Sequence, residues 1–157
     1  MRQLILVAMV IVAASCSSGG GGTPQSVVQP GHGAITVEII PNPIVAQHVS
    51  GDTYSFPFDV VVRETGRHAV SISRVTADVN ALGSIHVATE SYDAAQIRAL
   101  GYATTVPSNG TLRYHFAPQK SVPDERLFGG VSAELLVDAV DDTGAPITAS
   151  TTMTVRR

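Results

Sequence analysis

Hydrophobic and polar residues alternate with a period of two along most of the chain after residue 34. The clearest run extends from Tyr54 to Val62, and another joins Ile35, Val37 and Ile39. This period is typical of strands that bury one face. The predicted strands cover, in chain order, residues 35–39, 54–62, 68–79, 84–89, 111–117, 131–137 and 147–155. About seven short strands separated by turn signals predict an all-β antiparallel sandwich.

Four local signals refine this prediction. Pro57 cannot donate to a strand ladder, so its part of the sheet is expected at an edge or a bulge. The hydrophobic phase changes near residues 73–74, which predicts a bulge or bend in the third strand. Residues 64–67 (Glu-Thr-Gly-Arg) are expected to form a hairpin-like turn, and residues 141–144 (Asp-Asp-Thr-Gly) to join the last two strands.

One stretch has helical character. Residues 93–100 are expected to form a short helix that connects two strands, with Ser91 as a plausible N-cap and Gly101 as its stop. The polar, turn-rich segment 118–130 is predicted to be a mobile loop. The rest of the domain is therefore expected to be strands and tight turns.

The final hairpin carries a family resemblance. An Asp-Asp-Thr-Gly turn between two alternating strands, the last ending at Val155, resembles the closing hairpin of immunoglobulin-like and fibronectin type III-like modules in bacterial surface proteins. The resemblance is one of pattern over residues 35–157. The Cys and Trp signature of true immunoglobulin domains is absent, since the chain has one Cys and no Trp. The resemblance implies an immunoglobulin-like sandwich over residues 34–157.

The first residues form a different pattern. A short, positively charged start is followed by an unbroken apolar run over residues 4–13, too short to span a bilayer. Ala14, Ser15 and Cys16 then precede Ser-Ser-Gly-Gly-Gly-Gly. This arrangement resembles the lipobox of bacterial lipoprotein signal peptides. Residues 1–15 are therefore expected to be a signal peptide, and residues 16–33 a lipidated cysteine with a Gly/Ser-rich disordered tether.

The resemblance implies that Cys16 is acylated and anchors the protein in a membrane. Ala13 departs from the family, which usually has Leu at that position, so an ordinary cut that leaves a free thiol is the competing interpretation. Cys16 is the only cysteine and cannot form an internal disulfide. Ser17 occupies the position after the cysteine, where lipoproteins retained in the inner membrane commonly have Asp. The expected location is the bacterial cell envelope, and the outer membrane facing the periplasm if the host is Gram-negative.

Three patterns in the sequence suggest a catalytic or metal site, but each is better explained without one. Asp142-Thr143-Gly144 spells the aspartic protease triplet, but it occurs once and at a predicted turn. Asp138, Asp141 and Asp142 could hold calcium, although their spacing matches no calcium loop, which favours a solvated turn. The five histidines are scattered: His32, His48, His68, His86 and His115. We therefore expect no catalytic residues, no metal site and no cofactor.

Composition restricts the classes of partner that the protein is expected to bind. The net charge is −3 with no basic block, which argues against nucleic acid as a partner. The sequence predicts a lipid-anchored, non-catalytic module that binds an envelope protein or polymer, with candidate contact loops at residues 44–51 and 120–130. The alternative is a proteinase inhibitor or an enzyme on the same scaffold. The partner itself is not identified by any stretch of the sequence.

Overall fold

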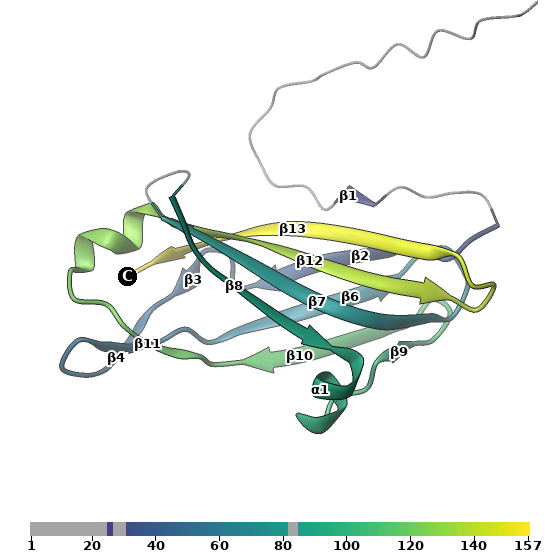
Figure 1. Ribbon diagram of the computed structural model, residues 1–157, viewed down its shortest axis with the longest axis horizontal. Helices are drawn as coiled ribbons and strands as arrows, with labels where there is room; N and C mark the ends of the chain where they lie inside the picture. Colours follow the sequence, from purple (N-terminus) through teal and green to yellow (C-terminus); the bar gives the residue numbers. More distant parts are fainter. Residues whose placement is uncertain (1–24, 27–30, 82–84) are drawn as a thin grey trace, which may run out of the picture.

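Two antiparallel sheets face each other in the computed structural model, which describes residues 25–26, 31–81 and 85–157 (Figure 1). The larger sheet contains four long strands in the order β13 (Pro146–Arg156), β12 (Val131–Asp141), β7 (Val70–Ala81) and β8 (Ile85–Asp93). The smaller sheet contains β10 (Thr111–Phe116), β6 (Phe58–Glu64) and β2 (Ile35–Ile40). The predicted all-β antiparallel sandwich is therefore confirmed.

Shorter elements extend these sheets. The larger sheet gains β1 (Gln25–Ser26) and β3 (Ile44–Val45), both on β13, and β9 (Thr105–Val106) on β7. A small third sheet contains β11 (Gln119–Ser121), β5 (Thr53–Ser55) and β4 (Gln47–Ser50). The helical elements are α1 (Ala94–Ala99) and the 3₁₀ helix η1 (Glu125–Gly130). The chain crosses between the two main sheets three times, from β6 to β7, from β8 to β10 and from β10 to β12, as in immunoglobulin-like sandwiches.

The core follows the alternation in the sequence. On β2, Ile35, Val37 and Ile39 are buried between the sheets, while Glu38 is exposed. β12 and β13 supply the opposing layer, with Leu135 and Met153 among its members. Each fully buried aliphatic side chain contributes about 1.5–3 kcal/mol. Because Trp is absent, these aliphatic residues supply most of the packing between the sheets.

The predicted continuous strand over residues 54–62 is wrong. Phe56 and Pro57 separate β5 from β6, and the two strands belong to different sheets. The backbone N–H of Phe56 donates to the carbonyl of Pro118, 2.9 Å away, and the ladder is interrupted at the next residue, Pro57, which has no N–H to donate. Tyr54 consequently packs with Phe128 in a small separate cluster and not in the main core.

The predicted bulge near residues 73–74 is confirmed. Asp138 on β12 pairs with Arg74, but the next residue of β12 pairs with Ile72, so Ser73 is the extra residue on β7. The Ser73 hydroxyl donates to the backbone carbonyl of Asp138 at 3.0 Å. The phase change in the sequence was therefore caused by one inserted residue.

The predicted hairpin turn at residues 64–67 is also wrong, because β6 and β7 do not pair. The turn carries the chain from the smaller sheet to the larger one. Glu64 is buried there, and its carboxylate accepts from the backbone N–H groups of Gly66, Arg67 and Asn109. A side chain, rather than strand pairing, therefore holds the turn together.

The short helix after β8 is confirmed, with a different cap. Asp93, not Ser91, is the N-cap: its carboxylate accepts from the N–H of Gln96, and the Gln96 side chain accepts from the N–H of Asp93. Ser91 lies within β8, which is longer than predicted. Gly101 has φ = 87° and ends the helix, as expected.

Candidate functional site

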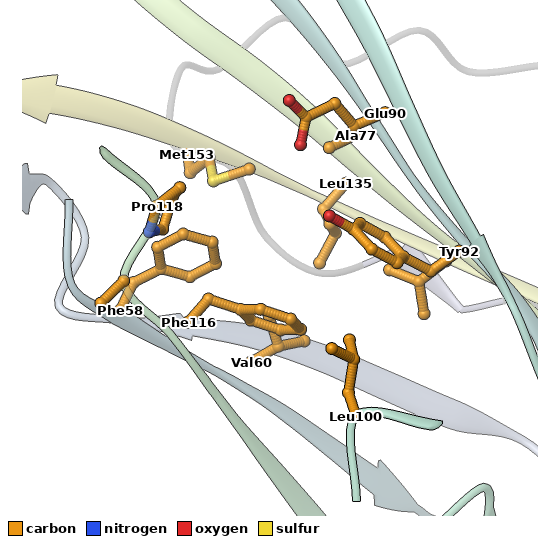
Figure 2. Close-up of a pocket in the computed structure, with 12 residues that line it drawn as sticks. Phe58, Val60, Ala77, Glu90, Tyr92, Leu100, Phe116, Pro118, Leu135 and Met153 are labelled. Atoms are coloured by element: carbon orange, nitrogen blue, oxygen red, sulfur yellow. The ribbon is translucent and has the colours of Figure 1, made fainter. Parts of the chain in front are cut away.

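An apolar cleft opens between the two main sheets, on the side where β8 and β10 are the outermost strands (Figure 2). Its volume is about 250 Å³. Both sheets contribute to its walls; the lining residues are Phe58, Val60, Val75, Ala77, Glu90, Tyr92, Leu100, Phe116, Ala117, Pro118, Leu135 and Met153. Concave apolar sites of this kind are the usual binding sites of proteins.

The cleft results from a mismatch between large and small side chains. On the smaller sheet, Phe58 and Phe116 lie side by side, with ring centroids 5.6 Å apart. On the larger sheet, Ala77 occupies the facing region and is too short to fill the gap to these rings (Figure 2). Ala77 on β7 pairs with Leu135 of β12 on one side and with Glu90 of β8 on the other. Its small side chain therefore lies next to the edge strand β8.

The mouth of the cleft carries one ion pair and two partly exposed apolar groups. Lys120 Nζ on β11 lies 3.0 Å from Glu90 Oε1 on β8. Tyr92 is 36% exposed and Leu100 is 54% exposed. The charged pair therefore bridges the larger sheet to the small third sheet, while the opening beside it remains apolar.

The helix α1 closes one end of the cleft. Ile97 is buried against the core, and Leu100 follows it at the rim. Beneath the helix, Tyr102 packs edge-on against Tyr114 with centroids 5.2 Å apart, and its hydroxyl donates to the backbone carbonyl of His115. Burial raises the pKa of Tyr114 to about 12. This end of the cleft is therefore lined by packed aromatic and aliphatic side chains.

Parts of the two predicted contact segments lie in the third sheet, and none of their residues lines the cleft. Residues 44–51 include β3 and β4. The segment 118–130, predicted as a loop, contains β11 and η1 and is therefore partly regular. β5 lies between β4 and β11 in the third sheet. Phe128 of η1 is buried, and its ring packs edge-on against Tyr54, 4.9 Å away. Aromatic contacts across these segments give them regular structure.

Of the aspartates considered for protease or calcium chemistry, Asp141 stabilises the turn between β12 and β13. Asp141 is buried, and its carboxylate accepts from Thr143, Gly33 and Ala145. The Thr143 hydroxyl, followed by these backbone N–H groups, holds the pKa of Asp141 well below its usual range. Asp142, the first residue of the protease-like triplet, pairs with His68 at the surface.

Asp138 is also separate from these groups, since its carboxylate accepts from the Thr148 hydroxyl on β13. Nowhere in the part of the chain that the structure describes do three or more His, Cys, Asp or Glu side chains gather in a way that could hold a metal ion. The three aspartates are therefore not brought together as calcium ligands.

Each histidine contacts its own partner, although His32 and His68 both lie beside the turn at residues 141–143. His32 lies beside Asp141 and Thr143, His48 contacts the carbonyl of Gly51, His68 pairs with Asp142, His86 lies beside Thr89, and His115 pairs with Asp59. The hydrogen bonds from His115 and then from Arg113 hold the pKa of Asp59 below its usual value. None of these histidines lines the cleft.

Sequence reasoning missed two features of the site. The cleft was not foreseen, because it depends on which side chains face each other between sheets. The buried role of Glu64 was also missed. Burial by itself would raise the pKa of Glu64, but the backbone N–H groups of Asn109, His68, Gly66 and Ala34 outweigh it and hold the pKa below its usual value. The only sequence signal was a carboxylate in phase with the core positions of its strand.

The predicted signal peptide, Cys16 and the first part of the tether lie outside the described residues. At the end of the predicted tether, Gly33 is buried against the sandwich, and Gln25–Ser26 pairs with β13. Within residues 25–26, 31–81 and 85–157, no helix is long and apolar enough to span a bilayer.

Comparison with known proteins supports the architecture. No protein-family model matches the chain, and no curated protein matches it. Among solved structures, it is similar to target SoR45 of the Northeast Structural Genomics Consortium, with 15% identity and a TM-score of 0.56 over 78% of this chain and 86% of that chain. The likeness is one of fold alone.

A second solved structure, the putative ApaA protein from Bordetella pertussis, is 12% identical. The match covers 87% of this chain and 96% of that chain with a TM-score of 0.43, too low to support an argument.

Proposed function

We propose that this protein is a lipid-anchored envelope protein whose sandwich domain binds a partner and performs no reaction on it. The observation that carries the proposal is the apolar cleft of about 250 Å³ between the two sheets. Exposed apolar concavities of this kind mark binding sites in soluble domains.

The chemistry of the cleft favours binding over catalysis. Glu90 is the one carboxylate among the residues that line it, and Lys120 pairs with that carboxylate at the mouth. Tyr92 is the one other lining residue with a titratable side chain. A general acid or base is usually tuned by burial or by a neighbouring group that is free to exchange protons. An ion-paired carboxylate at the rim is better suited to recognising a partner than to transferring protons.

The position of the cleft suits an anchored protein. Gln25–Ser26, the described residues nearest to Cys16, pair with β13, whereas the cleft opens beside β8. These are opposite margins of the larger sheet, separated by β12 and β7 (Figure 1). A tether that leaves from the β13 side leaves the cleft open to a partner in the envelope. If the host has an outer membrane, the expected site is its periplasmic face.

The anchor is tested by Cys16→Ala in the full-length chain. Loss of the thiol removes the acyl acceptor, so we expect labelled palmitate to disappear from the protein and the precursor to accumulate. Ser17→Ala is the matched control and should remain labelled and membrane-bound. A wild-type protein that is mainly soluble and unlabelled would overturn the anchor.

The binding site is tested by photo-crosslinking in cells. A benzophenone amino acid at Tyr92 lies at the mouth of the cleft, and the same group at Thr148 lies on the outer face of β13. We expect a discrete adduct in the envelope fraction from position 92 and not from position 148. Equal adducts from both positions, or none from position 92, would contradict a partner in the cleft.

A further inference from the structure

We infer that the partner is an extended segment of another protein, which adds as a strand to the free edge of β8 and places its inward side chains in the cleft. The inference rests on the proposed binding function and specifies the form of the ligand. The segment has apolar residues at alternate positions, with basic residues between them. Strand addition of this kind draws affinity from backbone hydrogen bonds and specificity from side-chain pockets.

The first argument is the unpaired edge of β8. In the described chain, β8 pairs with β7 on one side and with no strand on the other. Proteins usually block such edges with Pro, Lys or a covering segment, because unpaired N–H and C=O groups invite another strand. β8 has the sequence Ile-His-Val-Ala-Thr-Glu-Ser-Tyr-Asp, which contains neither Pro nor Lys. The bulge at Val87 disrupts the start of this edge and Glu90 points inward, so the stretch available for pairing is the regular part of the strand, Ala88–Asp93.

The opposite margin of the same sheet shows the contrast. Along β13, Ser150 and Ala149 pair with β1, and Val155 and Arg156 pair with β3. Between these strands the side chain of Asn42 donates to the carbonyl of Thr152 at 2.8 Å and accepts from the N–H of Thr154 at 3.1 Å. One margin of the larger sheet is therefore covered by the chain itself, whereas no strand among the described residues pairs with the outer edge of β8.

The second argument is the position of the cleft under that open edge. Glu90 and Tyr92 of β8 line the cleft, as do Phe116 and Pro118 at the end of β10 (Figure 2). A strand added outside β8 would cross the mouth between these two groups. Its inward side chains, about 7 Å apart at alternate positions, would face the rings of the smaller sheet.

The size of the cleft also favours side chains over a whole small molecule. Sites for drug-sized ligands have volumes of about 300–1,000 Å³. At about 250 Å³, this cleft suits one or two aliphatic side chains of a longer ligand. Val87 is the bulged residue opposite β7, so regular pairing on β8 runs over Ala88–Asp93. Six residues span about 20 Å, enough for three inward positions of an added strand.

The third argument is charge. The outer face beside β8 carries Asp78 and Glu134, which lie directly opposite each other on β7 and β12. Asp93 adds a carboxylate at the end of β8. Arg74 is the cation paired with Asp93 in register. Outward residues of an added strand would approach this acidic face, so basic side chains there would be attracted, as across complementary interfaces.

The test uses a synthetic, end-blocked peptide of eight residues in which Val and Lys alternate, added to the purified full-length protein in detergent. We expect saturable binding, and hydrogen exchange at Ala88–Asp93 should slow when the peptide is bound. A second peptide carries N-methyl groups on alternate residues along one edge. It keeps the side chains but cannot form the strand ladder, and it should bind at least tenfold more weakly.

Two protein variants locate the peptide. Ala77→Phe fills the cleft and should weaken binding at least tenfold. Val140→Phe adds the same ring at an exposed position of β12 and should leave binding unchanged. Thermal melting identifies a variant that fails to fold, and the methylated peptide tests strand addition without altering the protein.

The outcomes separate the two proposals. If Ala77→Phe weakens binding but N-methylation has no effect and Ala88–Asp93 gains no protection, the cleft binds without strand addition and this inference is overturned. An acyl chain is the occupant expected in that case. If Ala77→Phe binds like Val140→Phe, the cleft is not the site, and the proposed function falls as well. If the peptide does not bind at all, the proposal that the ligand alternates apolar and basic residues is overturned.

Discussion

The carboxylate Oδ2 of Asp141 accepts a hydrogen bond of 2.8 Å from the backbone N–H of Gly33, a residue 108 positions earlier. The same carboxylate accepts from Thr143 and Ala145 in the turn between β12 and β13. Because Asp141 is buried, these donors replace the water that the charge would otherwise need. The Asp141 side chain therefore joins the start of the sandwich to its closing hairpin, in addition to the pairing of β1 with β13.

Gly33→Ala should destabilise the domain. A Cβ at this position would lie 2.8 Å from Asp141 Cβ and 2.9 Å from Val70 Cγ2, and both neighbours are buried. We expect a loss of about 1–3 kcal/mol in the free energy of unfolding, measured by urea denaturation. Gly129→Ala is the control, because no atom lies within 4 Å of its added Cβ. Equal stability of the two variants would contradict the tight packing at Gly33.

Asp141→Asn should lower the thermal midpoint and flatten its acid dependence. The folded pKa of Asp141 lies below the unfolded value of 3.8, so its ionised form favours folding. That contribution is complete above about pH 5 and is lost as the pH falls through 3.8 toward the folded pKa. The variant lacks this titration. Thermal melts between about pH 2 and pH 7 measure the difference from wild type.

The control for this experiment is Asp142→Asn. Asp142 is exposed and its carboxylate pairs with His68 at the surface, where ion pairs contribute little to stability. We expect a thermal midpoint close to wild type, with the wild-type acid dependence retained. If Asp142→Asn lowers the midpoint more than Asp141→Asn, the assignment of the buried carboxylate is incorrect.

Asp93→Ala should weaken α1 and the end of the cleft that it closes. Removal of an N-cap carboxylate costs about 1 kcal/mol. Faster hydrogen exchange over Ala94–Ala99 would report the weaker helix. Ser91→Ala distinguishes the two caps: Ser91 lies within β8 and its hydroxyl contacts Thr76, so exchange in the helix should be unchanged. A larger effect from Ser91→Ala would favour the cap predicted from sequence.

Ile85→Lys combined with Val87→Lys should reduce self-association without loss of stability. These side chains are 58% and 59% exposed on the open edge strand. Charges there oppose pairing between copies of the chain, and surface substitutions change stability by about 0.5 kcal/mol or less. Sedimentation velocity at high protein concentration measures the association. A similar decrease in the control Val140→Lys would show that added charge alone accounts for the effect.

Local periodicity predicted the main strands and the short helix. The alternation at Ile35, Val37 and Ile39 placed their side chains in the core, and the phase change near Ser73 marked a real bulge. At Ile85 and Val87 the same rule failed, since both side chains are exposed on an edge strand. Alternation reports which side chains share a face; it does not report whether another layer covers that face.

Turns were less predictable because their partners lie far away in sequence. Residues 64–67 have the composition of a hairpin, yet Glu64 is held by the N–H of Asn109, 45 residues later. Similarly, the break at Pro57 was foreseen as an irregularity, but its consequence was not. The two halves of the predicted strand joined different sheets, and Tyr54 packed with Phe128.

The sequence by itself determined the all-β class, the alternation of apolar and polar positions along the strands and the position of α1. These features depend on contacts and preferences between near neighbours in the chain. The lipid anchor at Cys16 is a prediction from sequence alone, and Cys16 lies outside the described residues. Only the tertiary structure decided where the cleft opens. Ala77 leaves space there because the smaller sheet places Phe58 and Phe116 opposite it. Within the part of the chain that the structure describes, β8 pairs with β7 alone, which leaves the edge above that space unpaired.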